Sequence, residues 1–158
     1  MRTLAALLLV GIGLAGCANR HAHATYGNFI DVPEKFDGKV MAEDVAGKMV
    51  ALFPPARTSI KMRQTTLDAF GTTLTATLRR KGYALAEFDP GGRTVSQEAG
   101  APSRPPATDN LALAYLVDQP LDAGLYRLTV LINEQSLSRL YRAKDGSLVP
   151  AGYWVRKE

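Results

Sequence analysis

Hydrophobic residues recur with a helical period in the first half of the chain and alternate with polar residues in its last third. In residues 37–53 they return every three or four positions, at Val40, Met41, Val45, Met49 and Leu52. This spacing places them on one face of a helix. We expect Asp37 to cap the helix and Pro54 to end it.

The next segment predicts a strand–helix–strand unit over residues 58–88. Residues 58–64 (TSIKMRQ) alternate as a strand with one solvent-facing side does. A helix follows, with Thr65 or Thr66 as its cap and Asp68 in its first turn. Its expected buried stripe is Leu67, Phe70, Gly71, Leu74 and Leu78. The basic run 79–81 and then Gly82 end this helix, and residues 83–88 form a strand that we expect to be parallel to the first.

Residues 89–110 follow neither pattern. They hold four prolines and three glycines, and Val95 is their one large aliphatic residue, so we predict a mobile loop. Four β runs follow, at residues 111–118, 124–133, 136–143 and 148–155. The turn Lys144-Asp145-Gly146 is a strong hairpin signal. The pattern predicts a single α+β domain, with two helices packed on one face of a mostly antiparallel sheet.

The N-terminal segment has a different composition. Arg2 precedes an apolar run of about eleven residues, which is the length of a signal-peptide core and too short to span a bilayer. The run ends in Leu14, Ala15, Gly16 and Cys17, the only cysteine of the chain. These four residues resemble the lipobox of bacterial lipoproteins, in which the cysteine is lipidated and becomes the first mature residue. The alternative is an ordinary signal peptide with an incidental cysteine.

This interpretation divides the chain into three parts. Residues 1–16 are a signal peptide, residues 17–28 a flexible lipidated tether, and residues 29–158 the single periplasmic domain, which begins with an extended piece at 29–32. Lipid chains on Cys17 would hold the protein on a membrane stably. Because Ala18 stands where an inner-membrane retention signal would place Asp, we expect the outer membrane, with the domain facing the periplasm.

Charge and side-chain chemistry exclude several functions. The formal net charge is +4, and removal of Arg2 with the signal lowers it by one, which is too weak and scattered to predict nucleic-acid binding. The domain has no histidine or further cysteine, so nucleophile pairs of the Ser–His or Cys–His type are excluded. His21 and His23 lie in the tether and lack a third ligand. We predict no enzyme activity, metal, cofactor or small-molecule substrate.

Aromatic and basic residues near the C-terminus are candidates for partner binding. Tyr141, Tyr153 and Trp154 are of the types that dominate binding hot spots; the alternative is that they pack on the sheet. The arginines at 139, 142 and 156 can contact a partner or can form the solvent-facing side of edge strands.

Several passages resemble one known family. The lipobox at residue 17, LFPPARTSIKM (52–62), FGTTLTATLRRKGYAL (70–85) and SRLYRAKDGSLVPAGYWVRKE (138–158) are similar to TrbH-type conjugal transfer lipoproteins. The resemblance implies a structural part of a type IV secretion, mating-pair-formation apparatus, whose partners are other proteins of that apparatus. Two alternatives stay open. One is a general envelope lipoprotein, such as an assembly factor or pilotin-like chaperone, and the other is a periplasmic enzyme acting on cell-wall glycan.

Overall fold

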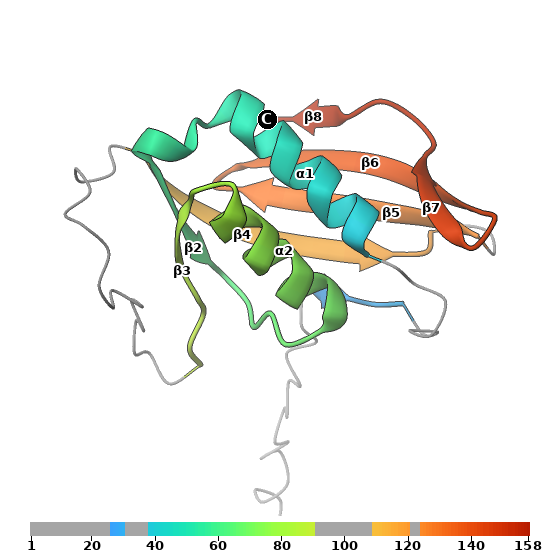
Figure 1. Cartoon of the computed structure of the whole chain (residues 1–158), viewed down its shortest axis with the longest axis horizontal. Helices are drawn as coiled ribbons and strands as arrows, with labels where there is room; N and C mark the ends of the chain where they lie inside the picture. Colours follow the sequence, from blue (N-terminus) through green and yellow to red (C-terminus); the bar gives the residue numbers. More distant parts are fainter. Residues whose placement is uncertain (1–25, 31–37, 91–108, 121–123) are drawn as a thin grey trace, which may run out of the picture.

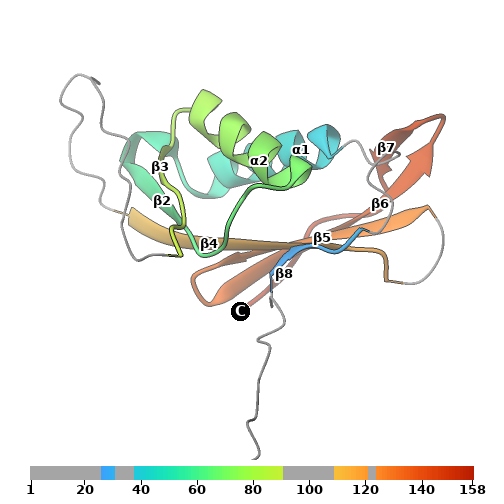
Figure 2. The same ribbon diagram turned by 90° about the horizontal axis from the view of Figure 1, so that it is seen from below.

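The computed structural model describes residues 26–30, 38–90, 109–120 and 124–158. They form one mixed, mostly antiparallel sheet of eight strands with two helices on one of its faces (Figures 1 and 2). The predicted α+β class is therefore confirmed. The expected cap Asp37 and residues 91–108 of the expected mobile loop lie outside the described residues.

The first helix, α1 (Lys39–Leu52), follows the predicted hydrophobic stripe. Its buried residues are Met41, Ala42, Val45, Ala46 and Met49. Gly38 occupies the N-cap position and makes no side-chain cap. The 3₁₀ turn η2 (Pro55–Arg57) follows, because two consecutive prolines cannot continue the ladder of helical hydrogen bonds.

The predicted strand–helix–strand unit is confirmed as β2 (Thr58–Met62), α2 (Ala69–Arg80) and β3 (Ala84–Ala86). β2 and β3 are parallel, with Ile60 opposite Leu85. Gly82 has φ +95°, as expected for a glycine that follows a helix. After Gly82 the amide of Tyr83 donates to the carbonyl of Leu78 (3.1 Å).

The start of α2 differs from the prediction. Asp68, not Thr65 or Thr66, is the N-cap, and its carboxylate accepts a hydrogen bond from the amide of Gly71 (3.0 Å). Leu67 therefore precedes the helix, and it is 90% exposed instead of belonging to the buried stripe. The other predicted stripe residues, from Phe70 to Leu78, are buried.

The last third of the chain forms the predicted antiparallel meander. Its strands are β4 (Asp109–Asp118), β5 (Leu125–Ile132), β6 (Gln135–Lys144), β7 (Ser147–Pro150) and β8 (Val155–Lys157). The order across the sheet is β3-β2-β4-β5-β6-β7, and β8 also pairs with β6. In the hairpin turn between β6 and β7, Asp145 and Gly146 have positive φ values of 50° and 76°.

Three boundaries are corrected. β4 begins at Asp109, inside the expected loop, because Asp109 and Asn110 pair with Thr58 and Ser59 of β2. The expected fourth run, 148–155, consists of the two strands β7 and β8. The expected extended piece at 29–32 is not the strand that forms: β1 (Gly27–Asn28) runs parallel to β4 within the range assigned to the tether, residues 29 and 30 follow it outside any strand, and residues 31 and 32 lie outside the described residues.

Candidate functional site

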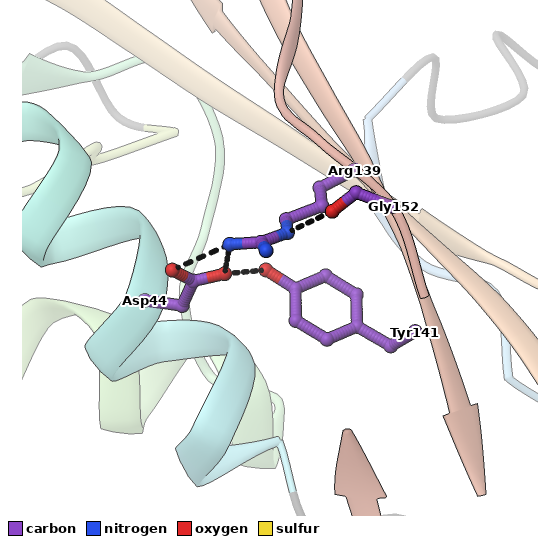
Figure 3. Close-up of polar contacts among 4 residues, drawn as sticks. All are labelled: Asp44, Arg139, Tyr141 and Gly152. Atoms are coloured by element: carbon purple, nitrogen blue, oxygen red, sulfur yellow. Dashed lines mark hydrogen bonds and ion pairs between the residues drawn. The ribbon is translucent and has the colours of Figure 1, made fainter. Parts of the chain in front are cut away.

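Strand β6 directs Arg139 and Tyr141 to the face of the sheet that the helices cover, where Asp44 of α1 meets both (Figure 3). One guanidinium nitrogen of Arg139 donates to both carboxylate oxygens of Asp44, at 3.0 and 2.8 Å. The hydroxyl of Tyr141 donates to the same carboxylate at 2.6 Å. We call these three residues the Asp44 cluster; it joins α1 to β6.

Helical geometry explains how a charged residue reaches this position. Asp44 lies directly before the buried Val45 and three residues after the buried Met41, so it borders the apolar stripe of α1. The side chains of Asp44 and Arg139 are only 24% and 20% exposed. A desolvated ion pair of this kind is stable only while all its hydrogen-bonding groups are matched, and Tyr141 supplies the additional donor.

The electrostatics of Tyr141 indicate a structural role. Burial is the largest cause that raises the pKa of its phenol, and the hydrogen bond to Asp44 and the charge of that carboxylate raise it further. The phenol therefore stays protonated and keeps donating. The Asp44 cluster holds two layers of the fold together.

The same arginine holds the segment between β7 and β8, residues 151–154. Tyr141 of β6 pairs with Pro150 of β7, and Ser138 of β6 pairs with Val155 of β8. The two β6 residues between these pairs, 139 and 140, therefore lie opposite four residues, so the segment forms an expanded bulge. The Nε of Arg139 donates to the carbonyl of Gly152 at 2.8 Å (Figure 3). Its guanidinium also lies 5.8 Å from the ring centroid of Trp154, within the range of a cation–π contact.

The three aromatic candidates therefore occupy different environments. Tyr141 is fully buried and its hydroxyl is bonded inside the domain, which favours the alternative that it packs on the sheet over a contact with a partner. Trp154 is partly buried and packs against the core. Tyr153 is 93% exposed between the anchored residues Gly152 and Trp154, and of these three candidates it is the one presented to solvent.

The arginine candidates also separate. Arg139 belongs to the Asp44 cluster and not to a solvent-facing side. Arg142 is exposed. Arg156 pairs with Glu158 at 2.7 Å, with both side chains largely in water, where an ion pair contributes little to stability.

Two aspartates that organise the helical layer had no place among the candidates. Besides Asp44, Asp68 accepts a hydrogen bond from the hydroxyl of Tyr115, which is fully buried on β4. Each aspartate thus accepts a hydrogen bond from a tyrosine of the sheet. The only sign of this role in the sequence is a position beside the apolar stripe of a helix, which does not reveal the tyrosine that each aspartate binds.

Other candidates fall outside the described residues, namely Cys17, the lipobox residues Leu14, Ala15 and Gly16, and the histidines at 21 and 23. Within the described part of the chain, no group of three or more His, Cys, Asp or Glu residues is placed to hold a metal ion. No helix in that part is long and apolar enough to cross a membrane.

The buried tyrosines predict how stability responds to alkaline pH. Burial raises the pKa of Tyr83 to about 12 and also raises those of Tyr115 and Tyr141. The unfolded chain loses these protons near pH 10 and the native state does not. The contribution of the three tyrosines to stability is therefore complete below about pH 10 and is lost as pH rises toward 12. Near-ultraviolet absorbance should show that these three tyrosines ionise in the same pH range in which the domain unfolds. Tyr83→Phe should remove one third of that amplitude; gradual ionisation before unfolding would contradict the prediction.

Comparisons with known proteins identify the family. The family model described as "Conjugal transfer protein TrbH" matches residues 23–158, which include every described strand and helix. No curated protein matches the chain. No solved structure matches it either. Since the match extends over most of the sequence, the chain belongs to the TrbH family of conjugal transfer proteins.

Proposed function

We propose that this protein is a lipid-anchored structural component of a conjugative type IV secretion apparatus, in which it supports mating-pair formation and DNA transfer. The observation that carries the proposal is the match of residues 23–158 to the conjugal transfer family TrbH. The anchor would be Cys17, and the location the periplasmic side of the outer membrane. The partners would be other proteins of the transfer apparatus, with no direct contact to nucleic acid.

The sequence before the domain supports the anchor. Leu14, Ala15, Gly16 and Cys17 follow an apolar run of signal-peptide length, and lipidation would give the single cysteine a role. Two or more acyl chains hold a protein on a membrane stably, whereas one holds it only marginally.

The segment 151–154 supports a role in protein binding. Tyr153 is exposed while Arg139 holds the carbonyl of Gly152 and contacts the ring of Trp154. An aromatic side chain on an ordered segment loses little conformational freedom when a partner covers it. Tyrosine is also among the residues enriched in binding hot spots.

Deletion of the gene from a conjugation donor tests the proposed function. We expect the transfer frequency to collapse and to return when the wild-type gene is supplied separately. Donor growth and envelope integrity should stay unchanged. Unaltered transfer together with a defect in another envelope system would contradict the proposal and favour the general assembly-factor or pilotin-like role.

Tyr153→Ala tests the binding segment in the same assay. Truncating a hot-spot residue costs at least about 2 kcal/mol of binding, or more than tenfold in affinity, so we expect transfer to fall while the thermal midpoint of the purified protein stays constant. Leu67→Ala is the matched control, because Leu67 is 90% exposed at the start of α2. Equal transfer by the two variants would remove Tyr153 from the interface.

A further inference from the structure

No described helix covers the face of the sheet opposite α1 and α2 (Figure 2). The strand register assigns residues to it, because directly paired residues point to the same side of a sheet. Lys61 aligns with Ala112, Arg127 with Asp118 and Leu140, and Ser136 with Lys157. We call the surface formed by these residues, together with every second residue from them along the same strands and the residues paired with those, the open face.

The open face is strongly one-sided in charge. Its strand positions carry a single carboxylate, Asp118, which is ion-paired with Arg127. They also carry four exposed cations that make no ion pair within the described residues, namely Lys61, Arg142, Lys144 and Lys157. On the helices and their caps, by contrast, the cations stand beside the carboxylates Glu43, Asp44 and Asp68.

Apolar side chains lie between these cations. Alternation along the strands assigns six of them to the open face: Leu116, Leu125, Leu131, Leu140, Val149 and Val155. Val155 is 65% exposed. Among them lie small residues such as Ala112, Thr129, Ser136 and Ser138, so the face combines a low apolar surface with long cationic side chains. Such side chains can lay their stems on apolar surface while their charges reach polar groups.

The chain length before the domain limits what this face can reach. Only residues 18–25 separate Cys17 from Tyr26, a span of at most about 30 Å when fully extended. Tyr26 precedes β1, which pairs with β4 at Leu116, one of the open-face residues. A lipid on Cys17 would therefore keep the part of the sheet around β1 within about this distance of the membrane surface.

We infer that the open face docks on the anionic headgroups of the membrane that carries the Cys17 lipid, an inference that rests on the anchor in the proposed function. Charge complementarity favours this occupant, since basic segments beside a membrane are attracted to anionic lipid. A second copy of the chain would present the same positive face and be repelled. The strand positions of the open face offer no aromatic platform, which single-stranded nucleic acid requires.

The test uses the mature lipidated protein, purified from bacterial membranes and reconstituted into vesicles. One vesicle type is phosphatidylcholine alone, and the other also contains phosphatidylglycerol; both carry a lipid-linked quencher. A fluorophore is attached to Val155→Cys on the open face or, as the control, to Gly47→Cys on an exposed part of α1 where nothing lies within 4 Å. Lipidated Cys17 has no free thiol to react.

We expect quenching at position 155 that requires phosphatidylglycerol and is lost at high salt, with no such quenching at position 47. Each exposed Lys or Arg near an anionic surface contributes about fivefold to partitioning. Lys61→Glu combined with Lys157→Glu should therefore lower docking by at least about 25-fold. The matched double reversal Lys48→Glu with Lys81→Glu, on the helical layer, should leave docking intact.

Three results would overturn the inference. The first is equal quenching at both positions, and the second is quenching that does not depend on phosphatidylglycerol. The third is a fluorophore at position 155 that becomes shielded only after other transfer proteins are added, which would assign the open face to a protein partner.

Flotation distinguishes failure of the docking from failure of the lipid anchor. A protein that floats with the vesicles but shows no quenching contradicts docking alone, whereas one that fails to float contradicts the anchor as well.

Discussion

Gly71→Ala should destabilise the domain by about 3 kcal/mol or more, because overpacking in a core and loss of a hydrogen bond to a charged group each cost about 1–3 kcal/mol. A Cβ on Gly71 would lie 2.2 Å from the hydroxyl oxygen of Tyr115 and 2.9 Å from the Cα of Thr66. Tyr115 is fully buried, packs edge-on against Phe70 and donates to Asp68. The Cα of Thr66 is a backbone atom and cannot give way as the end of a flexible side chain can. Chemical denaturation of the two purified proteins measures the difference.

Two further variants distinguish this steric effect from a general loss of helix stability. Gly47→Ala should stabilise the protein by about 0.5–1 kcal/mol, because Gly47 is exposed in α1 with open space around it. In a Tyr115→Phe background, Gly71→Ala should cost clearly less, since the clashing hydroxyl is gone. Equal costs in the two backgrounds would show that the close contact with Tyr115 is not the cause.

Asp44→Ala should have an effect of similar size. Removing one partner of a buried ion pair costs about 3–5 kcal/mol, and the partial exposure of this pair favours a cost of about 3 kcal/mol. The variant leaves Arg139 and the hydroxyl of Tyr141 without their shared acceptor. Hydrogen exchange should also accelerate in segment 151–154, because Arg139 then loses the contact that orients it toward Gly152.

The coupling between Asp44 and Arg139 is measured by a double-mutant cycle with Arg139→Ala, and we expect about 1–3 kcal/mol for a contacting pair. Glu158→Ala is the control, because it breaks the exposed pair with Arg156 and should change stability little. If the two single losses simply add, the Asp44 cluster does not act as a unit.

Local patterns made the architecture predictable. The stripes of α1 and α2, the alternation in β2 and the turn at Lys144-Asp145-Gly146 each depend on short-range periodicity or turn chemistry. These features determine which face each element buries, and the buried faces then determine how the layers stack. The parallel pairing of β2 and β3 follows from the helix that connects them.

The polar contacts between layers were not predictable in the same way. Tyr141 and Asp44 are 97 positions apart, and no spacing rule connects residues that meet only after the helices pack. Thr65 and Thr66 were plausible caps for α2, yet Asp68 is the N-cap. One of its carboxylate oxygens accepts a hydrogen bond from the amide of Gly71, and the other accepts one from the hydroxyl of Tyr115, which a threonine cap could not do at the same time. The division of 148–155 into β7 and β8 depends on Arg139, which holds the bulge from the neighbouring strand.

These contacts bear on the proposed role. Arg139 binds both Asp44 of α1 and the carbonyl of Gly152 in segment 151–154. The exposed Tyr153 therefore lies on a segment that is attached to the packed core. A component that transmits load or spacing within an envelope complex needs a contact residue that does not move independently of the core.

A donor strain lacking the gene tests most directly whether the membrane-anchored domain supports conjugal transfer. The strain is complemented with the wild-type gene or with a form in which residues 1–17 are replaced by the cleavable signal of a soluble periplasmic protein. At matched amounts of mature protein, we predict that the wild type restores transfer and the released domain leaves it at the level of the deletion. Full transfer by the released domain would contradict the claim.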